Sequence, residues 1–229
     1  MKFAAKVVFL SCLVFAGLVF TGCRATSTQG SGGIDLFNGK DFSGWTFYMK
    51  ANADPLRTWS VTNGVIHCAG RPLGYLRTEK SYHDYRLTVE WRFVKVARHA
   101  DNTGVLVHMQ LPEKVWPDCI ECQGQYHKQG DFWLHSGATA DGHQGVGDGK
   151  GNIYAPMAGS PNEKPVGEWG SYEVIARGDT VEIIVNGKSM NKITGCNLSS
   201  GFIGIQSEGA DIEVRKIYLE PLPAPASAI

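Results

Sequence analysis

Charge is scarce in this sequence, and the two signs cancel. Charged residues make up 19% of the 229 residues, and 22 Lys and Arg balance 22 Asp and Glu. No stretch concentrates positive charge. A protein that binds nucleic acid needs such a concentration to meet the phosphates. The composition therefore argues against nucleic acid as a partner.

Long apolar runs are also lacking, except at the start of the chain. A basic start leads into an almost wholly apolar run at residues 7–20, which is too short for a confident membrane span. This pattern is typical of a secretory signal peptide, residues 1–22. The small residues before Cys23 resemble a bacterial lipoprotein cleavage box, whose cysteine becomes the lipidated N-terminus. We expect export and a lipid anchor at Cys23 that holds the protein on a bacterial membrane, facing the periplasm or the cell surface. The alternatives are a cleaved soluble signal and an uncleaved anchor.

Cysteine offers no clear metal or redox motif. Cys119 and Cys122 form a C-x-x-C pair, but no second pair follows it and no helical pattern carries it. With Cys68 and Cys196 they are expected to be small buried hydrophobic side chains, or to form a disulfide that export would permit. The sequence leaves this choice open.

Helical periodicity is missing as well, and there is no internal repeat at the spacing of solenoids or propellers. Instead, apolar and polar residues alternate, without a break in residues 85–93 and again in residues 103–109. In the second stretch, Met109 is expected on the face of Val107, and His108 on the opposite face. Roughly a dozen short strands with this alternation predict an all-β fold, a sandwich of two antiparallel sheets.

Changes in composition divide the chain after the signal peptide. Residues 23–33 are rich in Ser, Thr and Gly and predict a flexible tether behind the lipidated cysteine. Residues 34–222 contain the strand pattern and are long enough for one domain with a sizeable core. The Pro- and Ala-rich residues 223–229 are expected to be a disordered tail.

A glycine-rich segment, residues 137–167, interrupts the strand pattern. A loop of this length inside a compact domain is usually functional or mobile. Its Asp141, His143 and Asp148 could bind a divalent cation such as calcium, but their irregular spacing makes this the weaker interpretation. The sequence predicts no required cofactor or metal.

The residues of one predicted strand alternate in chemistry. Ile120 and Cys122 are expected on one side of the sheet, and Glu121, Gln123 and Gln125 on the other. A carboxylate accepts hydrogen bonds and amides both donate and accept, so this row suits a polyhydroxylated ligand. The alternative is a solvated strand face.

Short motifs follow one another along residues 34–222 in a definite order. They are L-F-N-G-K-D-F-S-G-W (36–45), W-S-V-T-N-G-V-I (59–66), L-R-T-E-K (76–80), L-T-V-E-W-R-F (87–93), N-T-G-V (102–105), I-E-C-Q (120–123), G-E-W-G-S-Y-E-V (167–174), I-G-I-Q (203–206) and I-E-V-R-K-I (212–217). In this order they resemble the 3-keto-disaccharide hydrolase domain family. The resemblance implies a concanavalin A-like jelly roll, of the lectin and glucanase type, with a concave sugar-binding face. Glu208 stands where that family frequently has His.

An ordinary glycosidase needs two carboxyl groups that flank the bond, roughly 5 to 10 Å apart. Two and four residues after Glu121 the chain has Gln123 and Gln125, so the predicted strand does not supply a second acid. A partner could come from Asp118, from Glu208 or from the long loop.

The chemistry implied by the resemblance needs one base instead of two acids. A ketone at C3 of a sugar acidifies the hydrogen on C2, and removing that proton allows the C1 substituent to leave. Water then adds to the product. Such a path asks for a base, a group that polarises the ketone and an acid for the departing oxygen.

Candidate residues exist for each of these roles. We expect Glu121 to be the base. His108, predicted on the same side of the sheet, could polarise the ketone or protonate the leaving group, with His135 as the second candidate. Further residues are expected to bind the sugar by hydrogen bonds or ring stacking: Gln123, Gln125, Arg77, Asn102, Trp116 and Trp133. The tryptophans are equally compatible with the core, Arg77 with pairing to a surface acid, and His108 with a solvated strand position.

The leading functional hypothesis is an exported enzyme that cleaves the glycosidic bond of 3-keto-glucosides or 3-keto-disaccharides. One alternative is a non-catalytic, lectin-like module that binds glycans. The other is a conventional endo-glucanase. In all three the partner is a carbohydrate.

Overall fold

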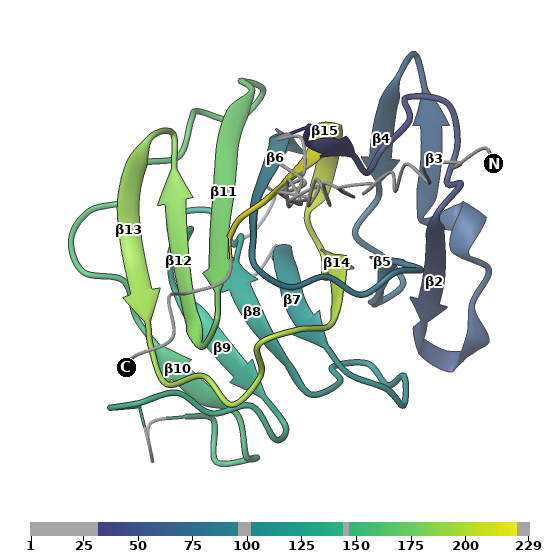
Figure 1. Cartoon of the computed structure of the whole chain (residues 1–229). Coiled ribbons are helices and arrows are strands. Elements are labelled where there is room, and N and C mark those ends of the chain that lie inside the picture. Colours follow the sequence, from purple (N-terminus) through teal and green to yellow (C-terminus); the bar gives the residue numbers. More distant parts are fainter. Residues whose placement is uncertain (1–31, 96–101, 144–146, 224–229) are drawn as a thin grey trace, which may run out of the picture. The chain divides into compact units, whose positions relative to one another are not determined.

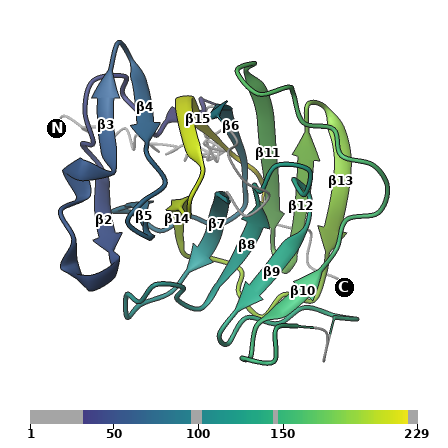
Figure 2. The same ribbon diagram turned by 180° about the vertical axis from the view of Figure 1, so that it is seen from behind.

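The computed structural model describes residues 32–95, 102–143 and 147–223. In this part of the chain, two antiparallel sheets form a sandwich (Figures 1 and 2). The predicted fold class, all-β with two antiparallel sheets, is confirmed. The predicted signal peptide, Cys23 with most of the tether, and residues 224–229 lie outside the described residues.

The first sheet has the order β13-β12-β11-β6-β15-β4-β3, and β1 also pairs with β15. Its strands are β1 (Ile34–Asp35), β3 (Trp59–Thr62), β4 (Val65–Cys68), β6 (Tyr85–Lys95), β11 (Gly170–Arg177), β12 (Thr180–Val185), β13 (Lys188–Ile193) and β15 (Asp211–Pro221). The second sheet has the order β10-β9-β8-β7-β14-β5-β2. Its strands are β2 (Trp45–Met49), β5 (Gly74–Thr78), β7 (Gly104–Met109), β8 (Cys119–Gln123), β9 (Phe132–His135), β10 (Ile153–Ala155) and β14 (Phe202–Ser207). Two short 3₁₀ turns, η1 (Lys50–Asn52) and η2 (Pro55–Arg57), follow β2.

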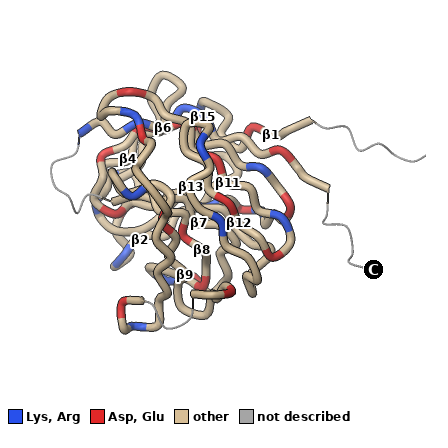
Figure 3. The backbone as a smooth tube through the Cα atoms, turned by 90° about the vertical axis from the view of Figure 1, so that its left-hand side faces the viewer, with Lys and Arg blue, Asp and Glu red and all other residues tan. Residues whose placement is uncertain are grey.

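Strand β6 shows why the sequence forms this sandwich. Its residues alternate between the core and the solvent-facing side, as predicted, and Leu87 and Val89 are fully buried. The polar residues between them pair across the sheet: Arg86 Nη1 lies 2.8 Å from Glu173 Oε2 on β11. Positive and negative positions are interspersed along the backbone (Figure 3). Each fully buried aliphatic side chain contributes about 1.5–3 kcal/mol.

The main core lies between the two sheets. From the second sheet, Val105, Ile120 and Ile205 join it and are buried. Ile120 on β8 and Val105 on β7 therefore face the first sheet. Glu121 lies between Ile120 and Cys122 in β8 and therefore projects from the opposite face of the second sheet, which we call the outer face.

The alternation predicted for residues 103–109 is wrong at its end. His108 has a φ of 53°, and Phe202 pairs with Met109 while Gly204 pairs with Leu106, so β7 holds one extra residue opposite β14. Such a bulge places two consecutive side chains on the same side of the strand. Met109 consequently joins Leu106 in a small apolar cluster separate from the main core.

The bulge turns His108 away from Glu121. Its ring packs edge-on against Tyr85 of the main core, with the ring centroids 6.0 Å apart, and Nδ1 lies 2.9 Å from the carbonyl oxygen of Leu198. Burial lowers the pKa of His108 to about 4. The prediction that His108 shares the side of Glu121 is therefore wrong.

The four cysteines of the described residues are buried free thiols. Burial raises the pKa of both Cys68 and Cys196 to about 12. They act as small core side chains, the first of the two alternatives. Among the described residues, no helix has the length and apolar character needed to cross a membrane.

Candidate active site

The outer face of the second sheet carries a row of residues from neighbouring strands. Cross-strand pairing aligns Arg77, Gly204, Leu106, Glu121 and Trp133, from β5 to β9 in that order. Residues directly opposite one another share a face of the sheet. Glu121 therefore projects from the middle of this face.

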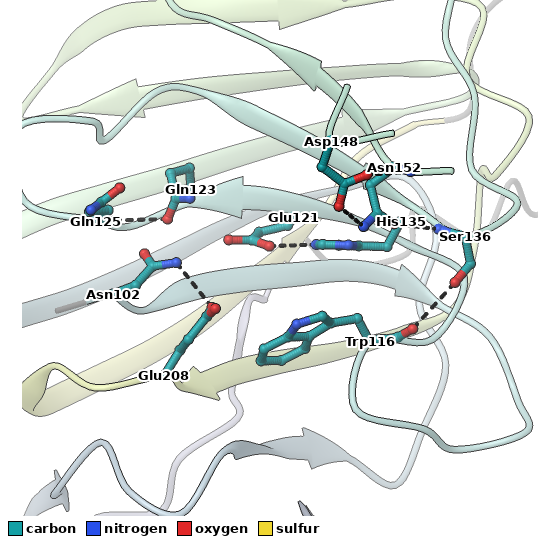
Figure 4. A network of polar contacts seen from close by, with 10 residues as sticks. All are labelled: Asn102, Trp116, Glu121, Gln123, Gln125, His135, Ser136, Asp148, Asn152 and Glu208. Carbon is teal, nitrogen blue, oxygen red and sulfur yellow. Dashed lines mark hydrogen bonds and ion pairs between the residues drawn. The ribbon is translucent and has the colours of Figure 1, made fainter. Parts of the chain in front are cut away.

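Glu121 is bound to His135 of the neighbouring strand. His135 Nε2 lies 2.5 Å from Glu121 Oε2, and the two side chains are 7% and 3% exposed. Burial by itself would lower the pKa of His135, but the hydrogen bond and the charge of Glu121 outweigh burial and raise it. The contact is thus a buried hydrogen bond between an imidazole and a carboxyl group, held by two adjacent strands (Figure 4), and the raised pKa favours the protonated form of His135.

Buried polar atoms without a hydrogen-bond partner gather around this pair. In the part of the chain that the structure describes they include Glu121 Oε1, His135 Nδ1, Asn102 Oδ1, Tyr75 Oη and both amide atoms of Gln206. Buried polar groups in proteins nearly always have a partner, which can be an ordered water or a ligand. A group of such atoms on one face makes this region the candidate site for a polar ligand.

Gly104 allows two of these residues to approach each other. It lies on β7, between Gln206 on β14 and Glu121 on β8. A Cβ atom at this position would lie 2.6 Å from Gln206 Oε1 and 3.3 Å from Glu121 Cγ. The absence of a side chain therefore allows the amide of Gln206 and the side chain of Glu121 both to lie close to the backbone of β7.

A second carboxyl group, that of Glu208, belongs to the same region. It follows β14, and its Oε2 accepts a hydrogen bond of 3.0 Å from Asn102 Nδ2. Burial and the charge of Glu121 raise the pKa of Glu208 to about 7, although the charge of His135 and the Asn102 hydrogen bond oppose them. Two carboxyl groups near one another do not both ionise readily.

The other predicted site residues lie at different distances from the pair of Glu121 and His135. Trp116 lies at the site, with its ring centroid 6.0 Å from that of His135. Gln123 is on the same face, but its Oε1 accepts from the backbone N–H of Gln125 at 2.9 Å and so holds a turn. Gln125 lies beyond the end of β8, where it is partly buried.

Arg77 and Trp133 lie on the outer face with partners of their own. Arg77 Nε binds Glu113 Oε1 at 2.6 Å, and its guanidinium stacks on Phe202, 4.5 Å from the ring centroid. Arg77 is therefore paired with an acid, which was the alternative to a role in sugar binding. Trp133 packs on Tyr154, with the ring centroids 4.7 Å apart.

Sequence reasoning missed Gln206 and Tyr75 as site residues and gave Glu208 no role in the proton-abstraction route. Gln206 and Glu208 are two positions apart, a spacing that puts both on one face of a strand. The I-G-I-Q motif contains Gln206, but the sequence does not reveal that β14, which carries this motif, lies next to β7. Tyr75 becomes a candidate only because it pairs with Gln206 across the sheet.

The predicted cation ligands are not brought together. Among the described residues, no group of three or more His, Cys, Asp or Glu side chains is arranged to hold a metal ion. Asp148 accepts hydrogen bonds from the backbone N–H of Lys150, at 2.8 Å, and from the side chain of Asn152. Asp148 therefore closes a turn in the glycine-rich segment.

Glu208 should make the stability of the fold depend on pH. Because the pKa is raised from 4.5 to about 7, the folded state binds this proton more tightly than the unfolded chain does. The resulting stabilisation is complete below about pH 4.5 and is lost as the pH rises to about 7. The variant Glu208→Gln should avoid this loss, which we expect to be on the order of 2 kcal/mol.

Urea unfolding at pH steps from 4 to 8 measures this difference. Asp118→Asn, which removes a carboxyl group that is 43% exposed, controls for the loss of one negative charge. Parallel pH curves for the wild type and Glu208→Gln would contradict the expected coupling.

The chain resembles a known protein family in sequence and several solved structures in fold. A family model described as 3-keto-alpha-glucoside-1,2-lyase-like domain matches residues 32–220. No curated protein matches the chain. Among solved structures, a proposed glycosyl hydrolase from Parabacteroides distasonis is 23% identical, with a TM-score of 0.61 over 84% of this chain and 94% of that one.

More distant structures share the same architecture. A β-glucanase from Bacillus licheniformis is 12% identical, with a TM-score of 0.55 over 85% of this chain and 100% of that one. A carbohydrate-binding module from Bacillus subtilis is 13% identical, with a TM-score of 0.54 over 77% and 95%. At these identities the likeness concerns the fold, which is the predicted sandwich of the lectin and glucanase type. By its family match, which agrees with the order of its motifs, the chain belongs to the 3-keto-alpha-glucoside-1,2-lyase-like domain family.

Proposed function

We propose that this domain cleaves the glycosidic bond of 3-keto-glycosides by removing the proton on C2 of the oxidised sugar. Glu121 is the base. The observation that carries this proposal is the arrangement of its carboxylate: His135 holds Oε2 at 2.5 Å, while Oε1 is buried without a partner. A general base needs a free basic atom in a fixed position.

The C3 ketone makes the C2 hydrogen acidic, so one base can start the reaction. Glu121 Oε1 takes the proton, and the electron pair of the C2–H bond forms an enolate with the C3 oxygen. The positive charge of His135 lies beside the developing negative charge and stabilises it. The amide of Gln206, which has both a donor and an acceptor free, suits the ketone oxygen and a neighbouring hydroxyl.

Collapse of the enolate then releases the C1 substituent. The C3 carbonyl re-forms, a double bond forms between C1 and C2, and the bond from C1 to the leaving oxygen breaks. Water adds across the new double bond to give the free 3-keto sugar, or the unsaturated sugar leaves as a lyase product. Trp116, beside His135, supplies an apolar surface for a sugar face.

A lectin-like module does not need a buried pair such as Glu121 and His135 to bind a sugar. Taking a carboxylate and an imidazolium out of water costs free energy, which their mutual attraction only partly offsets. A sugar-binding site can use neutral amides and hydroxyls without that cost. The buried pair therefore favours catalysis over simple binding.

Glu121→Gln should abolish cleavage and leave the fold intact. The amide has nearly the same shape but cannot take a proton, so we expect kcat/KM for a 3-keto-glucoside to fall by about 10³-fold. The assay measures new reducing ends from the 3-keto-glucoside, its unoxidised parent and a β-glucan, with Glu220→Gln, at an exposed position on β15 of the first sheet, as the control. Full turnover by Glu121→Gln would remove Glu121 from the mechanism. Cleavage of β-glucan would favour the conventional endo-glucanase, and binding without cleavage the lectin.

Deuterium on C2 of the substrate tests the order of events. Because the proposed first step breaks the C2–H bond, the labelled 3-keto-glucoside should react more slowly or exchange its deuterium with water. Mass spectrometry of recovered substrate and the ratio of initial rates measure both effects. A label that neither exchanges nor slows the reaction would contradict proton abstraction.

The location of the domain is part of the same proposal. The first 23 residues support export and attachment of lipid to Cys23, which would hold the domain on a bacterial membrane through the tether. In cells fed labelled palmitate, the full chain should carry the label and sediment with membranes, and Cys23→Ser should do neither. Equal membrane association of both proteins, without label, would contradict lipid anchoring.

A further inference from the structure

The backbone around Glu208 is held in place from two sides. Asn102 forms a bridge with Glu208, and its carbonyl oxygen accepts from the N–H of Ala210 at 3.0 Å. On the other side, the N–H of Gly209 donates to the carbonyl oxygen of Gly70 at 2.7 Å. Contact is so close there that a Cβ on Gly70 would lie 2.5 Å from the Gly209 backbone. Glu208 therefore starts from a fixed backbone position, as a functional side chain requires.

Within the described residues, one oxygen of the Glu208 carboxyl group accepts a hydrogen bond. Asn102 Nδ2 donates to Oε2 at 3.0 Å, and no other hydrogen bond to the carboxyl group occurs among the described residues. Its other oxygen, Oε1, remains available to a ligand. The second polar atom of Asn102, Oδ1, is buried without a partner, so this amide can also contact a substrate.

Glu208 and Glu121 belong to one site. Gln206, two residues before Glu208, and Glu121 both approach Gly104 on β7, which lies between their strands. Figure 4 shows Glu208, Asn102 and Trp116 grouped around the pair of Glu121 and His135. The carboxyl group of Glu121 comes from β8 and that of Glu208 from the residue after β14, with β7 between the two strands, so both border the same part of the sheet.

The carboxyl groups of Glu121 and Glu208 have different charged and polar neighbours, which suits them to different roles. His135 donates a hydrogen bond to Glu121, whereas the hydrogen-bond partner of Glu208 within the described residues is the neutral amide of Asn102. The charged groups that act on Glu208 are Glu121, which favours its protonated form, and His135 and Arg71, which oppose it. With burial added, the pKa of Glu208 reaches about 7. Glu208 can therefore hold a proton near neutral pH.

We propose that Glu208 is the general acid of the reaction and protonates the departing glycosidic oxygen through Oε1. The inference rests on the proposed function of Glu121. As the bond from C1 to oxygen breaks, its electron pair goes to that oxygen, which takes the proton of Glu208 and leaves as an alcohol. The Glu208 carboxylate then removes a proton from the water that attacks C1, while Glu121 returns its proton to C2. Both carboxyl groups end in their starting states.

The dependence on the leaving group separates an acid from a merely structural residue. A 4-nitrophenolate leaves without help, whereas methoxide needs a proton. For Glu208→Gln, kcat/KM should fall by about 10²–10³-fold with a methyl 3-keto-glucoside but by less than about threefold with the 4-nitrophenyl 3-keto-glucoside of the same anomer. Glu220→Gln, which changes an exposed carboxyl group on β15 of the first sheet, should behave as the wild type with both substrates.

A second measurement needs no variant and holds even if Glu208→Gln fails to fold. In the wild type, kcat/KM for the methyl substrate should decline above about pH 7, as Glu208 loses its proton, while the 4-nitrophenyl substrate shows no such decline. Glu208→Asp, which keeps an acid, should restore part of the activity on the methyl substrate. Equal losses for both substrates, or matching pH profiles, would overturn the role of Glu208 and leave that of Glu121 standing. A wild type that cleaves neither substrate would overturn the proposed function itself.

Discussion

The hydrogen bond between Glu121 and His135 joins two side chains that are almost fully removed from water. Neither charge would be stable there alone, because burial of an unpaired ion costs several kcal/mol. Together they hold each other in one orientation, which leaves one oxygen of Glu121 and one nitrogen of His135 without a partner. The free oxygen is the basis of the proposed proton abstraction, and the positive ring beside it is the basis of enolate stabilisation.

The sheet determines what can surround this pair. Three adjacent strands, β14, β7 and β8, carry Gln206, Gly104 and Glu121, and the missing side chain on β7 lets Gln206 and Glu121 approach it from both sides. Leu106, which pairs with Glu121 across the sheet, and Met109 form a separate apolar cluster on the same outer face, and such apolar surroundings lower the local dielectric constant. Because the polar groups stand on strands rather than on loops, their positions follow from the hydrogen-bonded ladder.

The ionisable groups of the site have to be considered together. Glu121, His135 and Glu208 influence one another, so their protons belong to the group and not to single residues. The hydrogen bond from His135 distinguishes Glu121 from Glu208, and the neutral amide of Asn102 leaves Glu208 free to keep a proton. One base and one acid thus arise from two carboxyl groups whose surroundings differ.

Local alternation was enough to predict much of this protein. The period of two in β6, and the alternation of Ile120, Glu121 and Cys122, depend only on neighbours along the chain, so the two-sheet class and the outward direction of Glu121 were determined by the sequence itself. The order of the motifs likewise indicated the family. What the tertiary structure alone decided was which residues meet Glu121. A single extra residue in β7 turned His108 into the core, and strand order brought together Asn102 and Glu208, 106 positions apart. Neither follows from periodicity, because a bulge and a long-range strand pairing depend on contacts that form only when the sheet closes.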